Sequence, residues 1–209
     1  MTTVKKKSID VDYDYIFIID CLPEDEYDKY KISQELMQFL ADNGIEQFTS
    51  ICRNRNLLIA TLEYLVKLAK QGAKFSIHFV SHGSEKGLWI KSTKEYVLWE
   101  IFRQYLKQIN DYMNGSLTIN MSSCFGLHGV KIVDEIDDHL PFFGLIGYNI
   151  KLKVKRAKEI NKSFYDKLIS GQQINEAVEN TKTELTDKSL FCITGLGYKI
   201  IRNTLAKHQ

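Results

Sequence analysis

Two patterns of apolar residues alternate along the chain. Runs of aromatic and β-branched residues predict buried strands, and apolar residues recurring every three to four positions predict amphipathic helices. The expected strands are 13–20, 48–51, 74–80, 116–121, 141–148 and 190–195, with a hairpin over 87–98. The expected helices are 32–40, 56–69, 101–109, 130–136, 158–169 and 174–185.

This alternation predicts an α/β fold, a three-layer α/β/α sandwich around a mostly parallel six-stranded sheet. Parallel strands need crossover connections, and helices in those crossovers cover both faces of the sheet. The pattern indicates one domain over residues 13–209, preceded by a basic tail over residues 1–12. Sheets of this kind bind ligands outside the carboxyl ends of their strands, so we look for a site there.

Composition narrows the class of protein. The chain has 209 residues, 44% of them hydrophobic, and its 28 basic and 26 acidic side chains nearly balance. That balance argues against a disordered chain and against a nucleic-acid binder, which would carry a basic face. The basic start is not followed by the apolar core of a signal peptide, and no apolar run approaches the roughly 20 residues that span a bilayer. We therefore expect a cytoplasmic protein that binds neither nucleic acid nor membrane.

The cysteines are Cys21, Cys52, Cys124 and Cys192. Four cysteines could form two disulfides, but a chain of this length without a signal peptide favours reduced thiols. Three of them lie in or beside apolar strand and helix patterns and are interpreted as small core residues. Cys124 is different, because it follows a strand and is flanked by serines and a glycine.

His82 and Cys124 end two consecutive long strands of the pattern. If these strands are neighbours, their axes lie about 4.8 Å apart and the two side chains emerge in one crevice. An imidazole can take the proton of a thiol, whose pKa is ordinarily near 8.5, and so supply a thiolate nucleophile. Gly83 allows close approach of the backbone and offers its N–H to an oxyanion, and Gly126 permits a tight turn into the next helix.

Either residue alone is more often structural, the histidine as a satisfied strand-end residue and the cysteine as a core residue. Their joint placement favours a thiol active site. Metal binding is not expected, because His78 and His82 would lie about 13 Å apart along a strand. His128 and His139 have no cysteine or carboxylate at ligand spacing. His128 is close enough in sequence to Cys124 to be an alternative base. No cofactor motif is present.

The segment Phe79–Ser84, followed by Ser122-Ser123-Cys124-Phe125-Gly126, resembles the caspase-fold cysteine peptidases. Their signature is a Gln-Ala-Cys-x-Gly run with a histidine about 50 residues upstream. The sequence is most similar to the bacterial caspase-like peptidases called CHAT domains. Residues 145–148 and 164–171, with Ala157 and Ala177, fit the carboxyl half of that family, so the resemblance covers roughly residues 13–197.

The resemblance implies hydrolysis of peptide bonds through a thioester acyl-enzyme. Cys124 would be the nucleophile and His82 the general base and acid, and the amides of Gly83 and Cys124 would form the oxyanion hole. Ser122-Ser123 stands where caspases have Gln-Ala, and that glutamine helps to bind an aspartate side chain in caspases. Strict aspartate specificity is therefore not expected.

In this fold the loop after the first strand helps to form the pocket for the residue before the scissile bond. Here that loop is acidic, and it supplies Asp20, Glu24 and Asp25 as candidate substrate-binding residues. The opposite wall would come from residues 149–156, which are basic. The further candidates near this wall are Ser122, Tyr148 and Asn149. A basic or small residue before the cut is expected, with solvated surface as the alternative interpretation of both charged runs.

The sequence thus predicts a caspase-like cysteine endopeptidase of a protein or peptide substrate, restrained by a regulatory or activating protein partner. By analogy with bacterial relatives it would act in defence or cell death. Two alternatives remain: a non-catalytic caspase-like scaffold, and an α/β hydrolase or transferase that uses Cys124 on a small molecule.

Overall fold

The computed structural model describes residues 13–133 and 139–206, so the predicted basic tail 1–12 lies outside the described residues. Within these ranges a six-stranded sheet has the order β2-β1-β3-β7-β8-β9, in which β9 is antiparallel and the other five strands are parallel. The strands are β1 (Tyr15–Asp20), β2 (Gln47–Ile51), β3 (Phe75–Val80), β7 (Thr118–Ser122), β8 (Gly144–Tyr148) and β9 (Leu190–Thr194). The predicted α/β fold with a mostly parallel six-stranded sheet is confirmed.

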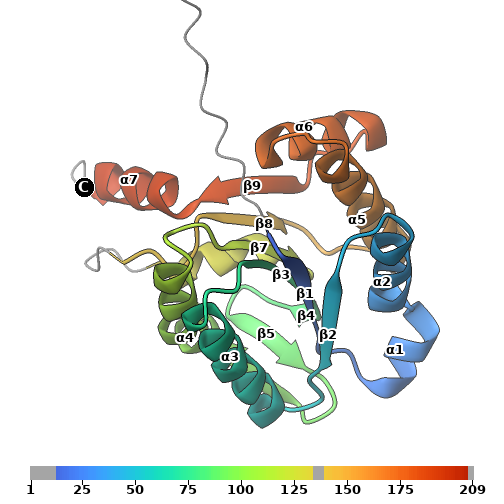
Figure 1. The fold of residues 1–209 in the computed structure, drawn as a ribbon, viewed down its shortest axis with the longest axis horizontal. Coiled ribbons are helices and arrows are strands. Elements are labelled where there is room, and N and C mark those ends of the chain that lie inside the picture. The colour runs from blue at the N-terminus through green and yellow to red at the C-terminus, as the bar shows by residue number, and fades with distance from the viewer. Residues whose placement is uncertain (1–12, 134–138, 207–209) are drawn as a thin grey trace, which may run out of the picture.

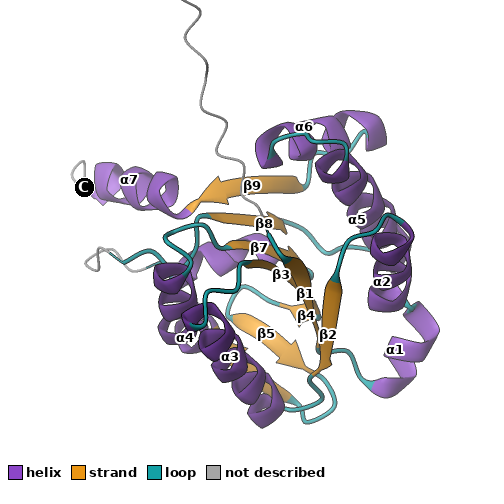
Figure 2. Cartoon of the chain, viewed as in Figure 1, coloured by secondary structure: helices purple, strands orange, loops and turns teal. Residues whose placement is uncertain are grey.

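Helices cover both faces of this sheet (Figure 1). The helices are α1 (Glu24–Tyr30), α2 (Ile32–Asp42), α3 (Arg55–Lys70), α4 (Trp99–Tyr112), α5 (Val154–Ile169), α6 (Ile174–Leu185) and α7 (Gly195–Ala206). α3 and α4 lie on one face, whereas α2 and α5 lie on the other (Figure 2). The arrangement is consistent with the three-layer sandwich that the sequence predicts.

Alternation along the strands divides the apolar residues between two cores. Phe17 and Ile19 of β1 pack in the core that contains the apolar faces of α3 and α4. Ile16 and Ile18 pack in the second core, with residues of α2, α5 and α6. Because successive side chains of a strand point to opposite faces, one short run of apolar residues can serve both layers.

The second face differs from the first, because the middle of the sheet is polar there. On the first face β3 and β7 present Phe75, Ile77, Phe79, Ile119 and Met121. The alternate positions form what we call the polar stripe: Ser76 and His78 of β3, and Thr118, Asn120 and Ser122 of β7. α5 covers the stripe, and Tyr165 of that helix hydrogen-bonds to His78 Nδ1 at 2.9 Å.

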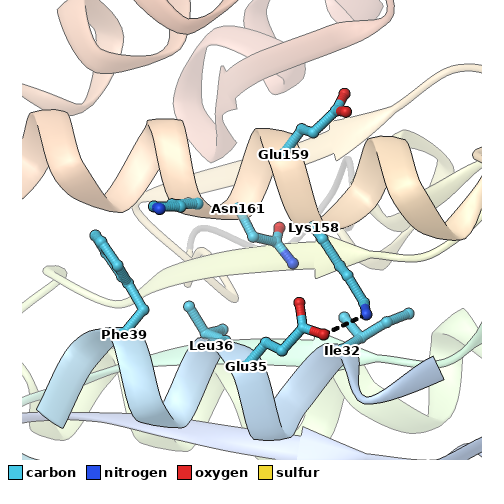
Figure 3. Close-up of a pocket in the computed structure, with 8 residues that line it drawn as sticks. Ile32, Glu35, Leu36, Phe39, Lys158, Glu159 and Asn161 are labelled. Atoms are coloured by element: carbon cyan, nitrogen blue, oxygen red, sulfur yellow. Dashed lines mark hydrogen bonds and ion pairs between the residues drawn. The ribbon is translucent and has the colours of Figure 1, made fainter. Parts of the chain in front are cut away.

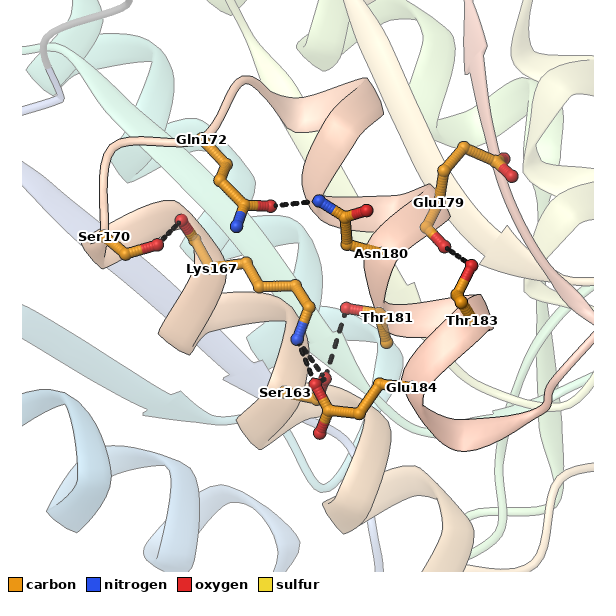
Figure 4. Close-up of polar contacts among 9 residues, drawn as sticks. All are labelled: Ser163, Lys167, Ser170, Gln172, Glu179, Asn180, Thr181, Thr183 and Glu184. Atoms are coloured by element: carbon orange, nitrogen blue, oxygen red, sulfur yellow. Dashed lines mark hydrogen bonds and ion pairs between the residues drawn. The ribbon is translucent and has the colours of Figure 1, made fainter.

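Charged pairs join the helices of this layer. Lys158 of α5 pairs with Glu35 of α2 at 2.6 Å across the small pocket in Figure 3. Lys167 of α5, only 9% exposed, donates to Ser163 Oγ at 3.0 Å and pairs with Glu184 of α6 (Figure 4). The hydrogen bond from Lys167 lowers the pKa of the Glu184 carboxyl. These contacts fix α5 between its neighbours.

A smaller sheet follows β3. β5 (Gly87–Ile90) and β6 (Glu95–Leu98) form the predicted antiparallel hairpin, and β4 (His82–Gly83) pairs with β5 as a third strand. Pairing of β4 was not predicted, because two residues are too few to show a pattern. This pairing holds the backbone of His82 against β5, and β3 holds the chain two residues before it.

One predicted helix needs correction, and two helices were not predicted. The α-helix expected over 130–136 is instead a 3₁₀ helix over Gly126–Ile132, and Ile136 lies outside the described residues. The backbone of this segment packs directly on β8, because a Cβ on Gly147 would lie 2.7 Å from Leu127 N. The helices α1 and α7 were not predicted. No helix in the described residues is long and apolar enough to cross a membrane.

Candidate active site

The two strands that lead to His82 and Cys124 are neighbours in the sheet, which is the condition for the predicted crevice. β3 and β7 pair in parallel, and Val80 is opposite Ser122 in their register. His82 and Cys124 each follow this pair by two residues, so the sheet brings both to the same edge. The segments are in contact there, because a Cβ on Gly83 would lie 2.2 Å from the carbonyl oxygen of Cys124. Only glycine fits at that position.

A tight turn carries Cys124 out of β7. Ser123 N–H donates to Met121 O at 2.8 Å, and Phe125 has a left-handed backbone with φ of 55°. That conformation is unusual for an aromatic residue and is characteristic of constrained positions at functional sites. A Cβ on Gly126 would lie 2.4 Å from Met121 O, which confirms the close turn expected at this glycine.

The turn leaves the Cys124 thiol partly exposed, whereas Cys21 and Cys52 are buried. All four cysteines are free thiols, as predicted. Leu152 N–H is directed at Cys124 Sγ at 3.4 Å, so the sulfur lies against the segment that follows β8. Phe125 N–H donates to Ile150 O at 3.1 Å in the same segment. The predicted opposite wall of the site therefore does contact the cysteine.

His82 is held by a carboxylate. Its Nε2 lies 2.5 Å from Oε2 of Glu26. Lys91, in the turn between β5 and β6, pairs with the other carboxylate oxygen. Glu26 is only 6% exposed. Burial opposes its ionisation, but hydrogen bonds from Lys91 and His82 outweigh burial and lower the pKa of the Glu26 carboxyl. A buried carboxylate with two cationic or donor partners fixes the orientation of the imidazole.

The position of Glu26 follows from the start of α1. Pro23 is the N-cap of this helix, and its first turn contains Glu24, Asp25 and Glu26, which suits the positive end of the helix dipole. Glu24 and Asp25 are exposed, whereas Glu26 turns inward to His82. This run was predicted as a loop, and Glu26 is not among the predicted site residues. The proline before three acidic residues is a helix-start signal that could have found it.

The imidazole and the sulfur are not hydrogen-bonded to each other in the described part of the chain. His82 uses Nε2 for Glu26, and its Nδ1 makes no hydrogen bond within the described ranges. This nitrogen is the one available to a thiol. Hydrogen bonds of catalytic groups are often long or absent without substrate and shorten when the substrate binds.

Two backbone amides beside these side chains donate to no acceptor in the described residues. Cys124 N–H donates no hydrogen bond to any described residue. Ser84 N–H donates to Gly87 O at 3.0 Å, and His82 and Gly83 pair with Trp89 and Leu88. Because bonded and non-bonded pairs alternate in an antiparallel ladder, Gly83 N–H points away from β5. Both N–H groups can therefore donate to a developing oxyanion.

The candidate substrate-binding residues fall into two groups, the first of which is buried. Asp20 is fully buried, and its carboxylate accepts from Leu22 N–H at 2.8 Å and from the Ser33 hydroxyl at 2.5 Å. Burial raises the pKa of Asp20. Ser122 lies beneath α5 and hydrogen-bonds to Asn161, and Tyr148 is fully enclosed in the second core. These three side chains support the strand ends rather than offer a surface to a substrate.

Glu24, Asp25 and Asn149 are exposed. The first two lie on α1 next to Glu26, and Asn149 immediately follows β8, with its N–H bonded to Ser189 O at 3.2 Å. They flank the site from the two segments that the sequence proposed as walls. Lys91 is a further charged residue of the site and is not among the predicted site residues.

The remaining histidines do not join the site. His128 packs edge-on against Phe125, and burial, together with Lys131, lowers the pKa of His128. It makes no hydrogen bond to Cys124 among the described residues. His139 is bonded to Asp111, in the last turn of α4, at 3.0 Å. Within residues 13–133 and 139–206, no three His, Cys, Asp or Glu side chains are grouped as metal ligands.

No protein-family model and no curated protein matches this chain.

Proposed function

We propose that the protein is a caspase-like cysteine endopeptidase in which Glu26, His82 and Cys124 act as a catalytic triad. The observation that carries the proposal is the set of contacts at one sheet edge. A buried carboxylate holds the imidazole, and the adjoining strand ends in a strained turn that presents a partly exposed thiol. A base with its own orienting partner next to a nucleophile is the general arrangement of acyl-transfer enzymes.

In the proposed reaction His82 Nδ1 accepts the thiol proton and the Cys124 sulfur attacks the peptide carbonyl carbon. A C–S bond forms, and the carbonyl electron pair moves to oxygen, where the Gly83 and Cys124 amides stabilise the negative charge. The imidazolium then gives its proton to the departing amine as the C–N bond breaks. Water, deprotonated by His82, cleaves the thioester to release the acid and restore the thiol.

Glu26 gives the triad its electrostatic support. The negative charge at 2.5 Å stabilises the imidazolium that forms after proton transfer. Lys91 compensates that charge when His82 is neutral, so the carboxylate is not left unpaired in a buried position. This division of work needs no cofactor and no metal.

Substrate preference is proposed from the exposed charges. Glu24 and Asp25 give the α1 side of the site a negative surface, and Lys151 and Lys153 give the opposite side a positive one. We expect a basic or small residue before the scissile bond, on the α1 side. The resemblance further suggests that the protein cleaves a protein substrate in the cytoplasm. A protein partner would control this activity, which would serve defence or cell death.

A peptide-library profile tests this function. Wild-type protein, Cys124→Ala and the matched control Cys192→Ala are incubated with the same library, because Cys192 is also partly exposed but lies on β9. Cleavage by wild type and Cys192→Ala, with none by Cys124→Ala, supports the proposal. Turnover of small esters without peptide cleavage would instead favour a small-molecule hydrolase.

A non-catalytic scaffold is the second candidate. The observation in its favour is that His82 is hydrogen-bonded to Glu26 and not to Cys124. If wild-type protein cleaves no peptide and a thiol-directed peptidyl probe reacts no faster with Cys124 than with Cys192, the scaffold explains the fold better.

A further inference from the structure

A cavity lies at the edge of the sheet opposite to the candidate active site. Its volume is about 570 Å³, within the range of small-molecule sites. The amino ends of β1, β3, β7 and β8 and the carboxyl end of α5 line it, together with the α5–α6 connection. We call it the amino-end cavity.

The lining of this cavity is uncharged. None of the described residues that line it is acidic, basic or a histidine. Ile16, Ile146, Phe164 and Leu168 supply apolar walls. A formally charged ligand would lose its hydration in such a site without gaining a counter-ion, so the lining selects against charge.

The polar stripe reaches the surface of this cavity. Ser76, Thr118 and Asn120 line it from the centre of the sheet. Asn120 is 4% exposed, and no group in the described part of the chain donates a hydrogen bond to its Oδ1. A buried acceptor without a donor is rare in folded proteins and calls for an explanation. Here the acceptor belongs to a residue that borders an open cavity.

We propose that the amino-end cavity binds an uncharged small molecule with an apolar or aromatic body and one N–H or O–H group. The body packs between the strands and the end of α5, and the N–H or O–H donates to Asn120 Oδ1. The site does not depend on the peptidase proposal, because none of its lining residues contacts His82 or Cys124 by a hydrogen bond in the described ranges.

The first experiment uses N-phenyl-1-naphthylamine, an uncharged aromatic amine whose fluorescence rises in apolar surroundings, with the complete chain. Its sulfonated analogue, 8-anilinonaphthalene-1-sulfonate, is the charged comparison. We expect saturable binding of the amine and binding of the sulfonate weaker by at least about tenfold. No saturable binding, or equal affinity for the two probes, overturns the proposal.

The second experiment tests the hydrogen bond. Asn120→Leu keeps the volume of the side chain and removes the acceptor, and the N-methylated amine removes the donor. Each change alone should weaken binding by up to about tenfold, and the two together no more than either one. Fully additive effects would show that the N–H does not meet Asn120.

The third experiment locates the probe in the wild-type protein, so it holds even if Asn120→Leu fails to fold. Cys192 lines the amino-end cavity, whereas Cys124 lies at the opposite edge. Burial raises the pKa of Cys192 to about 11, so labelling with N-ethylmaleimide is followed at mildly alkaline pH. Bound amine should slow labelling of Cys192 and leave Cys124 unchanged. Protection of both thiols, or of neither, contradicts the assignment.

Discussion

His82 Nε2 and Glu26 Oε2 lie 2.5 Å apart, in a contact that joins α1 to β4, which begins two residues after the end of β3. The contact fixes which imidazole nitrogen is left for Cys124. It also places a negative charge where a positive charge must develop if the histidine deprotonates a thiol. Lys91, on the other carboxylate oxygen, completes the arrangement.

Glu26→Gln should reduce peptidase activity more than it reduces stability. The amide keeps the shape but cannot stabilise an imidazolium, so we expect kcat/KM to fall by roughly 10²-fold, within the range of general acid–base effects. The matched control is Asp25→Asn, which changes an exposed neighbour of the same helix turn. Equal losses in the two variants would contradict a role for Glu26 in orienting His82.

The pH dependence of the same pair follows from the lowered pKa of Glu26. Its contribution is present above the ordinary carboxylate pKa and is lost as pH falls through the lower value in the folded protein. Activity limited by this group should therefore persist into mildly acidic solution in the wild type. A pH–rate profile of wild type beside Glu26→Gln checks this, since the variant has no carboxyl group to titrate.

Gly83→Ala should abolish activity because the new Cβ would lie 2.2 Å from Cys124 O and push the two strand ends apart. The control is Gly144→Ala, a strand glycine of β8, whose Cβ would meet nothing closer than 4.0 Å. Kinetics and thermal unfolding of both variants test the prediction. Full activity of Gly83→Ala would show that the close approach is unnecessary.

Asp20 is expected to act on stability and not on specificity. Replacement by Ala removes the acceptor of Leu22 N–H and Ser33, and should cost about 1–3 kcal/mol in the free energy of unfolding. Its cleavage preference should match that of the wild type, whereas Glu24→Ala with Asp25→Ala should weaken preference for basic residues. A changed preference in Asp20→Ala would restore it as a substrate-binding residue.

His78 makes stability depend on pH. Burial lowers its pKa to about 3, so the folded protein keeps it neutral while the unfolded chain takes up a proton near pH 6.5. Stability should be complete above that pH and fall by up to about 1.4 kcal/mol per pH unit below it. Urea unfolding of wild type and His78→Gln between mildly acidic and neutral pH measures the slope. A slope unchanged in the variant would assign the dependence to other groups.

The hydrophobic pattern predicted most of the sheet because the central strands β1, β3, β7 and β8 are buried on both faces, which favours apolar residues along them. It also placed His82 and Cys124 at adjacent strand ends. The short elements were less predictable, since α1 and β4 have too few residues to show a period. The 3₁₀ helix after Cys124 packs directly on the backbone of β8, where a Cβ on Gly147 would lie 2.7 Å from Leu127 N, and no local sequence pattern contains that contact.

The site was predicted only in part, for a related reason. Strand ends can be placed from sequence, but the inward or outward direction of a side chain on a short helix cannot. Glu26 was therefore overlooked beside Glu24 and Asp25. Asp20, Ser122 and Tyr148 were expected to bind substrate, but at the strand ends their side chains are buried.

The most direct test of the proposed triad is the rate at which a peptidyl chloromethyl ketone with lysine next to the ketone alkylates each thiol, followed by mass spectrometry. We predict selective modification of Cys124 in the wild type, and a rate lower by at least about 10²-fold in His82→Ala. Modification of Cys124 at the same rate in both proteins, or no preference for Cys124 over Cys192, would contradict the account.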